Sequence, residues 1–190
     1  MQVDVHIHGR PHPGETESGD AAGVHVDGAV TWVLVLDALG HGPEAAKVGT
    51  LALAALRELD AQLSPLQAFR RLSGATQGTR GAAAALLRFE PGRISLIGIG
   101  NVELRTLSGA SLPYIPAKGI LGRRLPANIR SRDIQPIGPG RVLLYTDGIE
   151  RKAPVFKLAE IHPGPELAQA LIREHALERD DALAAHVAYR

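Results

Sequence analysis

Residues 31–45 have the sequence TWVLVLDALGHGPEA. Its apolar run ends at Asp37, and a turn that contains Gly40 and Gly42 leads to Pro43. A short apolar run of this kind predicts a buried strand, and proline is favoured in the first turn of a helix. The segment therefore predicts a strand that carries a carboxylate at its end, followed by a loop and a helix.

Outward from this segment, the hydrophobic pattern predicts further strands and helices. Alternation of apolar and polar residues marks strands, and apolar residues at helical spacing mark amphipathic helices. Asp27-Gly28 predicts a hairpin turn, and a Gly- and Pro-rich loop is expected over residues 108–126. We expect strands over residues 3–9, 21–25, 30–36, 82–89, 93–99, 102–107, 141–146 and 182–189, and helices over 43–59, 65–72 and 165–178.

The order of these elements favours an α+β fold. Runs of strands joined by short turns are typical of antiparallel sheets, and we expect the strands over 82–89, 93–99 and 102–107 to be consecutive neighbours. Eight or nine strands exceed the usual size of one twisted sheet, so we expect two packed, mostly antiparallel sheets flanked by helices. With 190 residues, the chain is expected to form a single domain, residues 1–190.

Composition excludes several classes of function. The formal net charge is +1, which is not the strongly basic balance of an electrostatic nucleic-acid binder. No apolar run is long enough for a membrane span, so we expect a soluble, cytoplasmic protein with neither nucleic-acid nor membrane partners. Because the chain has no cysteine, disulfides, thiolate nucleophiles and Cys-type zinc sites are impossible.

Four aspartates lie where predicted strands begin or end. They are Asp20, Asp37, Asp147 and Asp180. Any one of them could simply form a turn beside glycine. Several carboxylates at strand ends, in a chain without cysteine, favour Mg²⁺ or Mn²⁺ in oxygen coordination over zinc. Two such ions about 3.5–4 Å apart would suit phosphate-ester hydrolysis.

The order of the short motifs around these residues resembles a known family. SGD, an apolar strand into D-x-x-GHG, TRG before a strand, YTDG, and DDA before a final strand follow one another from Gly19 to the end. This order is similar to that of the metal-dependent PPM protein phosphatases, in their bacterial SpoIIE/RsbU/RsbX branch. The likeness is greatest to the stand-alone RsbX type, because no sensor or membrane region precedes the motifs.

The resemblance implies an αββα sandwich and a set of ligands for two manganese or magnesium ions. Asp37 would bridge both ions, and the backbone carbonyl of Ala38 would bind the second. Asp147 and Asp180 would hold the first ion, and Asp20 would act mostly through water at the second. Ala38 departs from the glycine usual after the bridging aspartate. Its methyl would add strain if the backbone there required a positive φ.

The resemblance also implies a reaction and a substrate. A hydroxide bound by two metals would attack phosphoserine or phosphothreonine, without a phospho-enzyme. His41 is a candidate proton donor, or else a loop imidazole that orients the turn. Arg80 is a candidate phosphate ligand, or else the partner of a neighbouring aspartate. The substrates implied are phosphorylated STAS-domain regulators of a bacterial stress-signalling complex, the stressosome.

Other interpretations compete with this one. A catalytically silent binding module could keep the same fold. Gly40, Gly42 and Ala45 also fit a dinucleotide fingerprint, although the expected acidic residue after a second parallel strand is missing. His6 and His8 resemble the paired imidazoles of barrel hydrolases, but such barrels need about 250 residues. Strand alternation explains both histidines as one solvated face.

Overall fold

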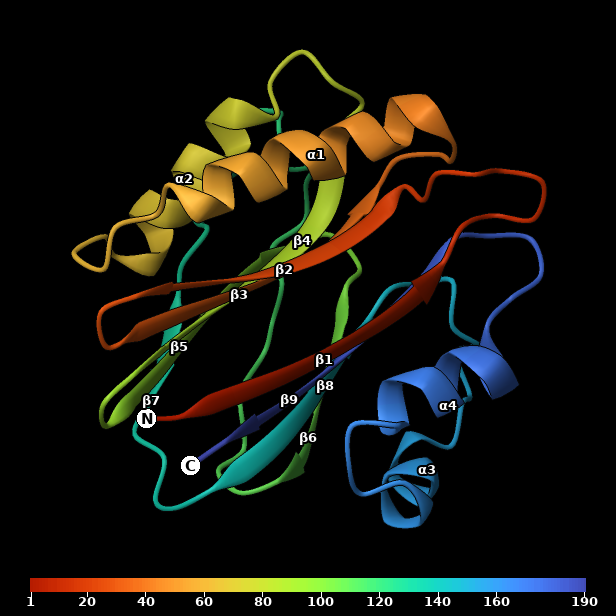
Figure 1. The fold of residues 1–190 in the computed structure, drawn as a ribbon. Helices are drawn as coiled ribbons and strands as arrows, with labels where there is room; N and C mark the ends of the chain where they lie inside the picture. Colours follow the sequence, from red (N-terminus) through yellow and green to blue (C-terminus); the bar gives the residue numbers. More distant parts are fainter.

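The computed structural model describes residues 1–190, which form two antiparallel sheets flanked by two pairs of helices (Figure 1). One sheet has four strands in the order β1-β9-β8-β6, and the other has five in the order β2-β3-β4-β5-β7. The strands are β1 Val3–Arg10, β2 Asp20–Asp27, β3 Val30–Ala38, β4 Ala82–Glu90, β5 Arg93–Ile99, β6 Glu103–Ser108, β7 Arg132–Ile134, β8 Gly140–Tyr145 and β9 Ala182–Tyr189. The helices are α1 Pro43–Arg57, α2 Pro65–Ala75, α3 Val155–Ile161 and α4 Leu167–His175. The predicted α+β sandwich is confirmed.

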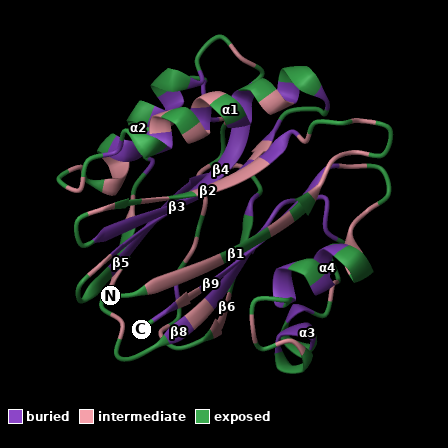
Figure 2. Ribbon diagram, in the orientation of Figure 1, coloured by how far each residue is buried: buried purple, intermediate pink, exposed green.

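Three apolar layers hold the molecule together. α1 and α2 pack on the five-stranded sheet, the two sheets pack on each other, and α3 and α4 pack on the four-stranded sheet (Figure 1). β3 and β4 are buried along almost their whole length (Figure 2). Trp32 and Leu34 of β3 face the helices, whereas Val33 and Val35 face the other sheet. Burial on both faces explains why this strand is a continuous apolar run rather than an alternating one.

The helix ends follow from local sequence. α2 begins after Ser64, whose hydroxyl accepts a hydrogen bond from the Gln67 amide, and the Gln67 side chain accepts from the Ser64 amide. This reciprocal capping box satisfies two amides that a helix end otherwise leaves unpaired. α1 has Pro43 in its first turn, as predicted, and Gly42 before it has a φ of 75°. The loop between β3 and α1 therefore depends on a glycine at this position.

Several sequence predictions were wrong in detail. β6 does not pair with β5 but lies in the other sheet beside β8, because the chain crosses between the sheets at Gly100 and buries Val102 and Leu104 between them. α3 and the short edge strand β7 were not predicted. The helix expected over 165–178 is shorter, Leu167–His175. In the edge strand β1, Ile7 is 42% exposed, so the predicted apolar face of this strand ends at Val5.

The dinucleotide interpretation is also wrong. β4 is the strand that follows α1 and α2, and it runs antiparallel to β3. A dinucleotide fold needs a parallel strand at that point. No helix of the structure has the length and apolarity required to cross a membrane.

Candidate metal centre

The four candidate aspartates lie at one end of the sandwich. Asp20 starts β2 and is paired directly opposite Asp37 of β3 in the antiparallel register. Asp147 follows the end of β8, and Asp180 precedes the start of β9, which pairs antiparallel with β8. Two carboxylates thus come from each sheet.

Thr146 ties the two sheets together at this end. Its buried hydroxyl donates a hydrogen bond to Oδ2 of Asp20, 2.7 Å away, and accepts one from the Leu183 amide at 3.0 Å. Asp20 belongs to the five-stranded sheet, whereas Thr146 and Leu183 belong to the four-stranded one. The hydroxyl therefore fixes the distance between β2 and β8 beside Asp147.

The aspartates repel one another. Burial, then the nearby Asp20, Asp147 and Asp180 carboxylates, raise the pKa of Asp37 to about 8. Burial also raises the pKa of Asp20 to about 7, although the Thr146 hydrogen bond opposes this shift. The pKa of Asp180 is raised too, by burial first and Asp147 second. Mutual shifts of this kind occur when like charges share a poorly solvated site.

No basic side chain forms an ion pair with these carboxylates. The ion pairs of the chain involve Asp4 and five glutamates, and none reaches Asp20, Asp37, Asp147 or Asp180. Asp20 is buried, Asp37 and Asp180 are partly buried, and carboxylates clustered in such a place without an ion-pair partner are costly. A divalent cation would relieve this repulsion.

Neighbouring groups hold some of the carboxylates. Asn101, in the turn before β6, donates a hydrogen bond from Nδ2 to Oδ2 of Asp147 at 2.7 Å. Asp181 accepts hydrogen bonds from the backbone amides of His12 and Gly19, so this residue anchors the loop before β2. In this structure no three acidic or histidine side chains are arranged as a ready metal-binding group.

The chemistry of the donor set nevertheless fits a hard cation. The side chains that converge are carboxylates, which suit Mg²⁺ and Mn²⁺. Ala38 ends β3, and no residue other than glycine has a positive φ. Ala38 therefore has a backbone conformation that a side chain tolerates, and its methyl causes no strain. The carbonyl of Ala38 remains a candidate ligand.

His41 lies in the glycine loop after β3. Its Nδ1 is 2.9 Å from Oε1 of Glu15, its ring stacks on His12 with 4.2 Å between centroids, and its side chain is 50% exposed. A carboxylate therefore orients the imidazole, which leaves Nε2 as the ring nitrogen without a partner in the protein.

Arg80 lies beside the same loop. A Cβ placed on Gly40 would come within 2.5 Å of its guanidinium, so Gly40 allows this arginine to approach the turn. The ion pair with an aspartate, the alternative role for Arg80, is not formed. Its guanidinium remains available to an anion.

Sequence reasoning missed several residues of this site. Thr146, Asn101 and Glu15 do not stand out, because a threonine before an aspartate and an asparagine after a glycine are common in turns. Gly148 was also overlooked: a Cβ there would lie 1.7 Å from the Asp181 carbonyl oxygen. Its only sequence signal is the YTDG motif itself.

The chain is similar in sequence and fold to known proteins. The family described as Stage II sporulation protein E (SpoIIE) matches residues 27–190. The chain belongs to the SpoIIE family of PPM-type phosphatases. Membership of this family, on a shared fold, makes it a serine/threonine protein phosphatase. No curated protein matches the chain.

Solved structures similar to this SpoIIE-family chain share its whole fold. A chain from a structure described as "The bacterial stressosome: a modular system that has been adapted to control secondary messenger signaling" is 28% identical, with a TM-score of 0.88 and 100% of both chains covered. RsbX in complex with magnesium is 20% identical, with a TM-score of 0.80 and 98% of this chain and 94% of that chain covered. The catalytic domain of PstP with two manganese ions is 16% identical, with a TM-score of 0.70 and 99% of each chain covered.

Proposed function

We propose that this SpoIIE-family phosphatase is metal-dependent and removes phosphate from phosphoserine or phosphothreonine of STAS-domain proteins in a stress-signalling complex. The observation that carries the proposal is the cluster of uncompensated carboxylates from both sheets, Asp20 and Asp37 facing Asp147 and Asp180. These side chains and the Ala38 carbonyl would hold two divalent ions.

Each residue has a definite part in this proposal. When bound, two Mg²⁺ or Mn²⁺ ions would activate water for attack on phosphorus and stabilise the charge of the phosphoryl oxygens. The carboxylates of Asp20, Asp147 and Asp180 all lie near enough to Asp37 to raise its pKa, so Asp37 would be the ligand that contacts both ions. Thr146 and Asn101 would orient Asp20 and Asp147 through their hydrogen bonds. Arg80 would pair with a phosphate oxygen.

His41 remains the candidate proton donor for the leaving alkoxide. Glu15 accepts the hydrogen bond of Nδ1, so the proton that a protonated His41 would donate to the alkoxide is the one on Nε2. Its exposure would allow a substrate hydroxyl to reach it.

Support for the substrate class comes from similarity. A chain from a stressosome structure and RsbX with magnesium are both similar to this chain over its full length. We infer that phosphorylated stress-signalling regulators are its substrates, which would place the protein in the cytoplasm.

The test is hydrolysis of an aryl phosphate and of a phosphorylated STAS-domain protein, with EDTA or with added Mn²⁺. We expect Mn²⁺-dependent release of phosphate from both, and its loss in Asp37→Asn. Activity that ignores metal, or that survives this substitution, would overturn the proposal. Binding of the phosphoprotein without any hydrolysis would identify the silent binding module instead.

A further inference from the structure

Two adjoining cavities lie on the outer face of the four-stranded sheet. One, of about 390 Å³, is lined by Asn101, Glu103, Arg105, Tyr145, Thr146, Asp147, Ile149 and Arg151. The other, of about 410 Å³, is lined by Arg105, Tyr145, Arg151 and residues 153–157. Because they share three residues, they form one groove, which we call the Asp147 groove. Each cavity falls within the roughly 300–1,000 Å³ typical of ligand pockets.

The groove begins at the candidate metal centre. Asp147 and Thr146 line its first cavity, and Tyr145, only 6% exposed, belongs to both cavities. From there it runs between β6 and the segment that leads into α3. A phosphorylated residue at the aspartates would therefore place its neighbouring chain in this groove.

The charge of the groove is positive. Arg105 pairs with Glu103 at 3.1 Å, and both side chains are nearly half exposed. Arg151 and Lys157 are exposed and form no ion pair. Asp147, at the end of the groove, belongs to the proposed metal ligands. Two uncompensated cations therefore face whatever lies in the groove, and Phe156, 58% exposed, adds an apolar contact.

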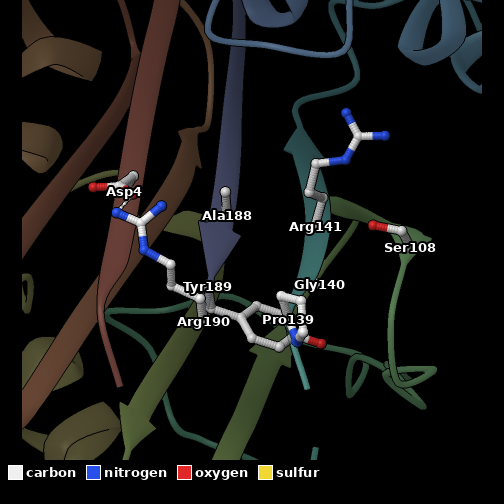
Figure 3. A pocket seen from close by; sticks show the side chains of 8 residues that line it. All are labelled: Asp4, Ser108, Pro139, Gly140, Arg141, Ala188, Tyr189 and Arg190. Carbon is white, nitrogen blue, oxygen red and sulfur yellow. Dashed lines mark ion pairs between the residues drawn. The ribbon is translucent and has the colours of Figure 1, made fainter. Parts of the chain in front are cut away.

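A cavity at the opposite end of the same strands has fewer cations without an ion pair. It is lined by the start of β8 and the end of β9, with a volume of about 270 Å³ (Figure 3). Its Arg190 lies 3.8 Å from Asp4, and its Arg141 donates a hydrogen bond to the Pro163 carbonyl. In that cavity only Arg190 has a carboxylate partner, so Arg141 is its one cation without an ion pair, against two such cations in the Asp147 groove.

We infer that the Asp147 groove binds an acidic segment of the phosphoprotein substrate, next to the phosphorylated residue, and that Arg151 and Lys157 determine this preference. The inference rests on the proposed function and adds a substrate class to it. Opposite charges across an interface supply specificity more than raw affinity, and exposed pairs weaken with salt. The groove thus selects among phosphoproteins.

The first test measures binding without catalysis. Two unphosphorylated fluorescent peptides of equal length, one with three glutamates and one with three glutamines in their place, are titrated with the full chain and Mn²⁺ at low salt, so that Asp147 is occupied as proposed and no hydrolysis can occur. We expect about tenfold tighter binding of the glutamate peptide, and loss of this difference in Arg151→Glu/Lys157→Glu. Arg57→Glu/Arg70→Glu is the matched control, because both residues are exposed on helices that cover the other sheet. Equal binding of the two peptides would overturn the inference.

The second test uses phosphoserine versions of the same peptides with Mn²⁺. We expect kcat/KM to favour the glutamate peptide, and the ratio of the two values to fall toward one in Arg151→Glu/Lys157→Glu but not in the control. An unchanged ratio would overturn the inference. If neither peptide is hydrolysed, the proposed function fails, and the binding test still decides the groove.

Discussion

Asp37 has no basic partner, and three other carboxylates raise its pKa. The pKa of Asp37 is about 8 in the folded protein, against an ordinary 3.8. Its contribution to the stability of the fold is therefore fully present below pH 3.8 and is lost as the pH rises to about 8. We expect Asp37→Asn to raise the stability of the metal-free protein by about 1–2 kcal/mol at pH 8.5, and by less at pH 6. Urea unfolding at both pH values in EDTA measures this.

The control for this prediction is Asp133→Asn, which removes a carboxylate that is exposed and outside the cluster. It should change stability little at either pH. A destabilised Asp37→Asn at pH 8.5 would show that the carboxylates are not in conflict, and would contradict the electrostatics of the proposed site.

We expect Thr146 to act as a positioning residue for Asp20. Thr146→Val keeps the shape of the side chain but removes the hydroxyl that contacts both Asp20 and the Leu183 amide. We expect the free energy of unfolding to fall by about 1–3 kcal/mol, because buried hydrogen-bonding groups are left without a partner. We also expect weaker Mn²⁺ affinity, measured by the metal dependence of aryl-phosphate hydrolysis, with Thr146→Ser restoring most of it. Unchanged metal affinity in Thr146→Val would contradict the positioning role.

Sequence alone locates the aspartates but not their supports. Asp37 and Asp147 end apolar runs, and this signal is visible without a structure. Thr146 and Asn101 act through hydrogen bonds to residues far away in sequence, 126 and 46 positions apart. No periodicity or motif encodes such a distance. The roles of the aspartates as metal ligands stay a prediction.

At the scale of elements, β9 contains a buried histidine. His186 is 2% exposed, neither ring nitrogen has a hydrogen-bond partner, and its ring stacks on His6 of β1. Burial, then the positive charge of Arg141 and His6, lowers its pKa to about 4, whereas Glu166 opposes this shift. Folded His186 therefore stays neutral in a pH range where the unfolded chain is protonated.

The low pKa of His186 makes the stability of the fold depend on pH. Between pH 6.5 and 4 the unfolded state binds more protons at this residue, so stability falls as pH falls. The wild type should lose stability between pH 7 and pH 4.5, and we expect His186→Leu to lose roughly 2 kcal/mol less over this range. Urea unfolding at the two pH values checks it, with His8→Gln, on the neighbouring edge strand, as control. A variant with the same pH dependence as the wild type would refute this account.

The elements themselves were predicted well where burial dictates their pattern. β5 and β9 have the predicted bounds, and β3 lies within two residues of them, because core strands leave a strong apolar signal. β6 was placed in the wrong sheet, since a short turn such as Gly100-Asn101 can join neighbours or carry the chain across a sandwich. α3 has only seven residues, too few for a clear period.

At the scale of the whole molecule, the proposed ligands join the two sheets. Asp20 and Asp37 come from the five-stranded sheet, whereas Asp147 and Asp180 flank strands of the four-stranded one. Since the unfolded chain cannot hold these carboxylates together, a metal bound between them should stabilise the entire fold rather than one loop.

We therefore expect Mn²⁺ at 100 times its dissociation constant to stabilise the protein by about 2.7 kcal/mol. For a chain of this length, the corresponding rise in Tm is about 5–10 °C. A thermal melt with Mn²⁺ or EDTA measures it, and Asp37→Asn should abolish the shift because it removes the ligand that we propose both ions share. Ca²⁺ is a useful control for charge alone, since its larger size and preference for more ligands suit this carboxylate set less well. If Asp37→Asn kept the full Mn²⁺ shift, the ion would bind elsewhere, and the two sheets would be held together at this end without it, by their apolar core and the hydrogen bonds of Thr146 and Asp181.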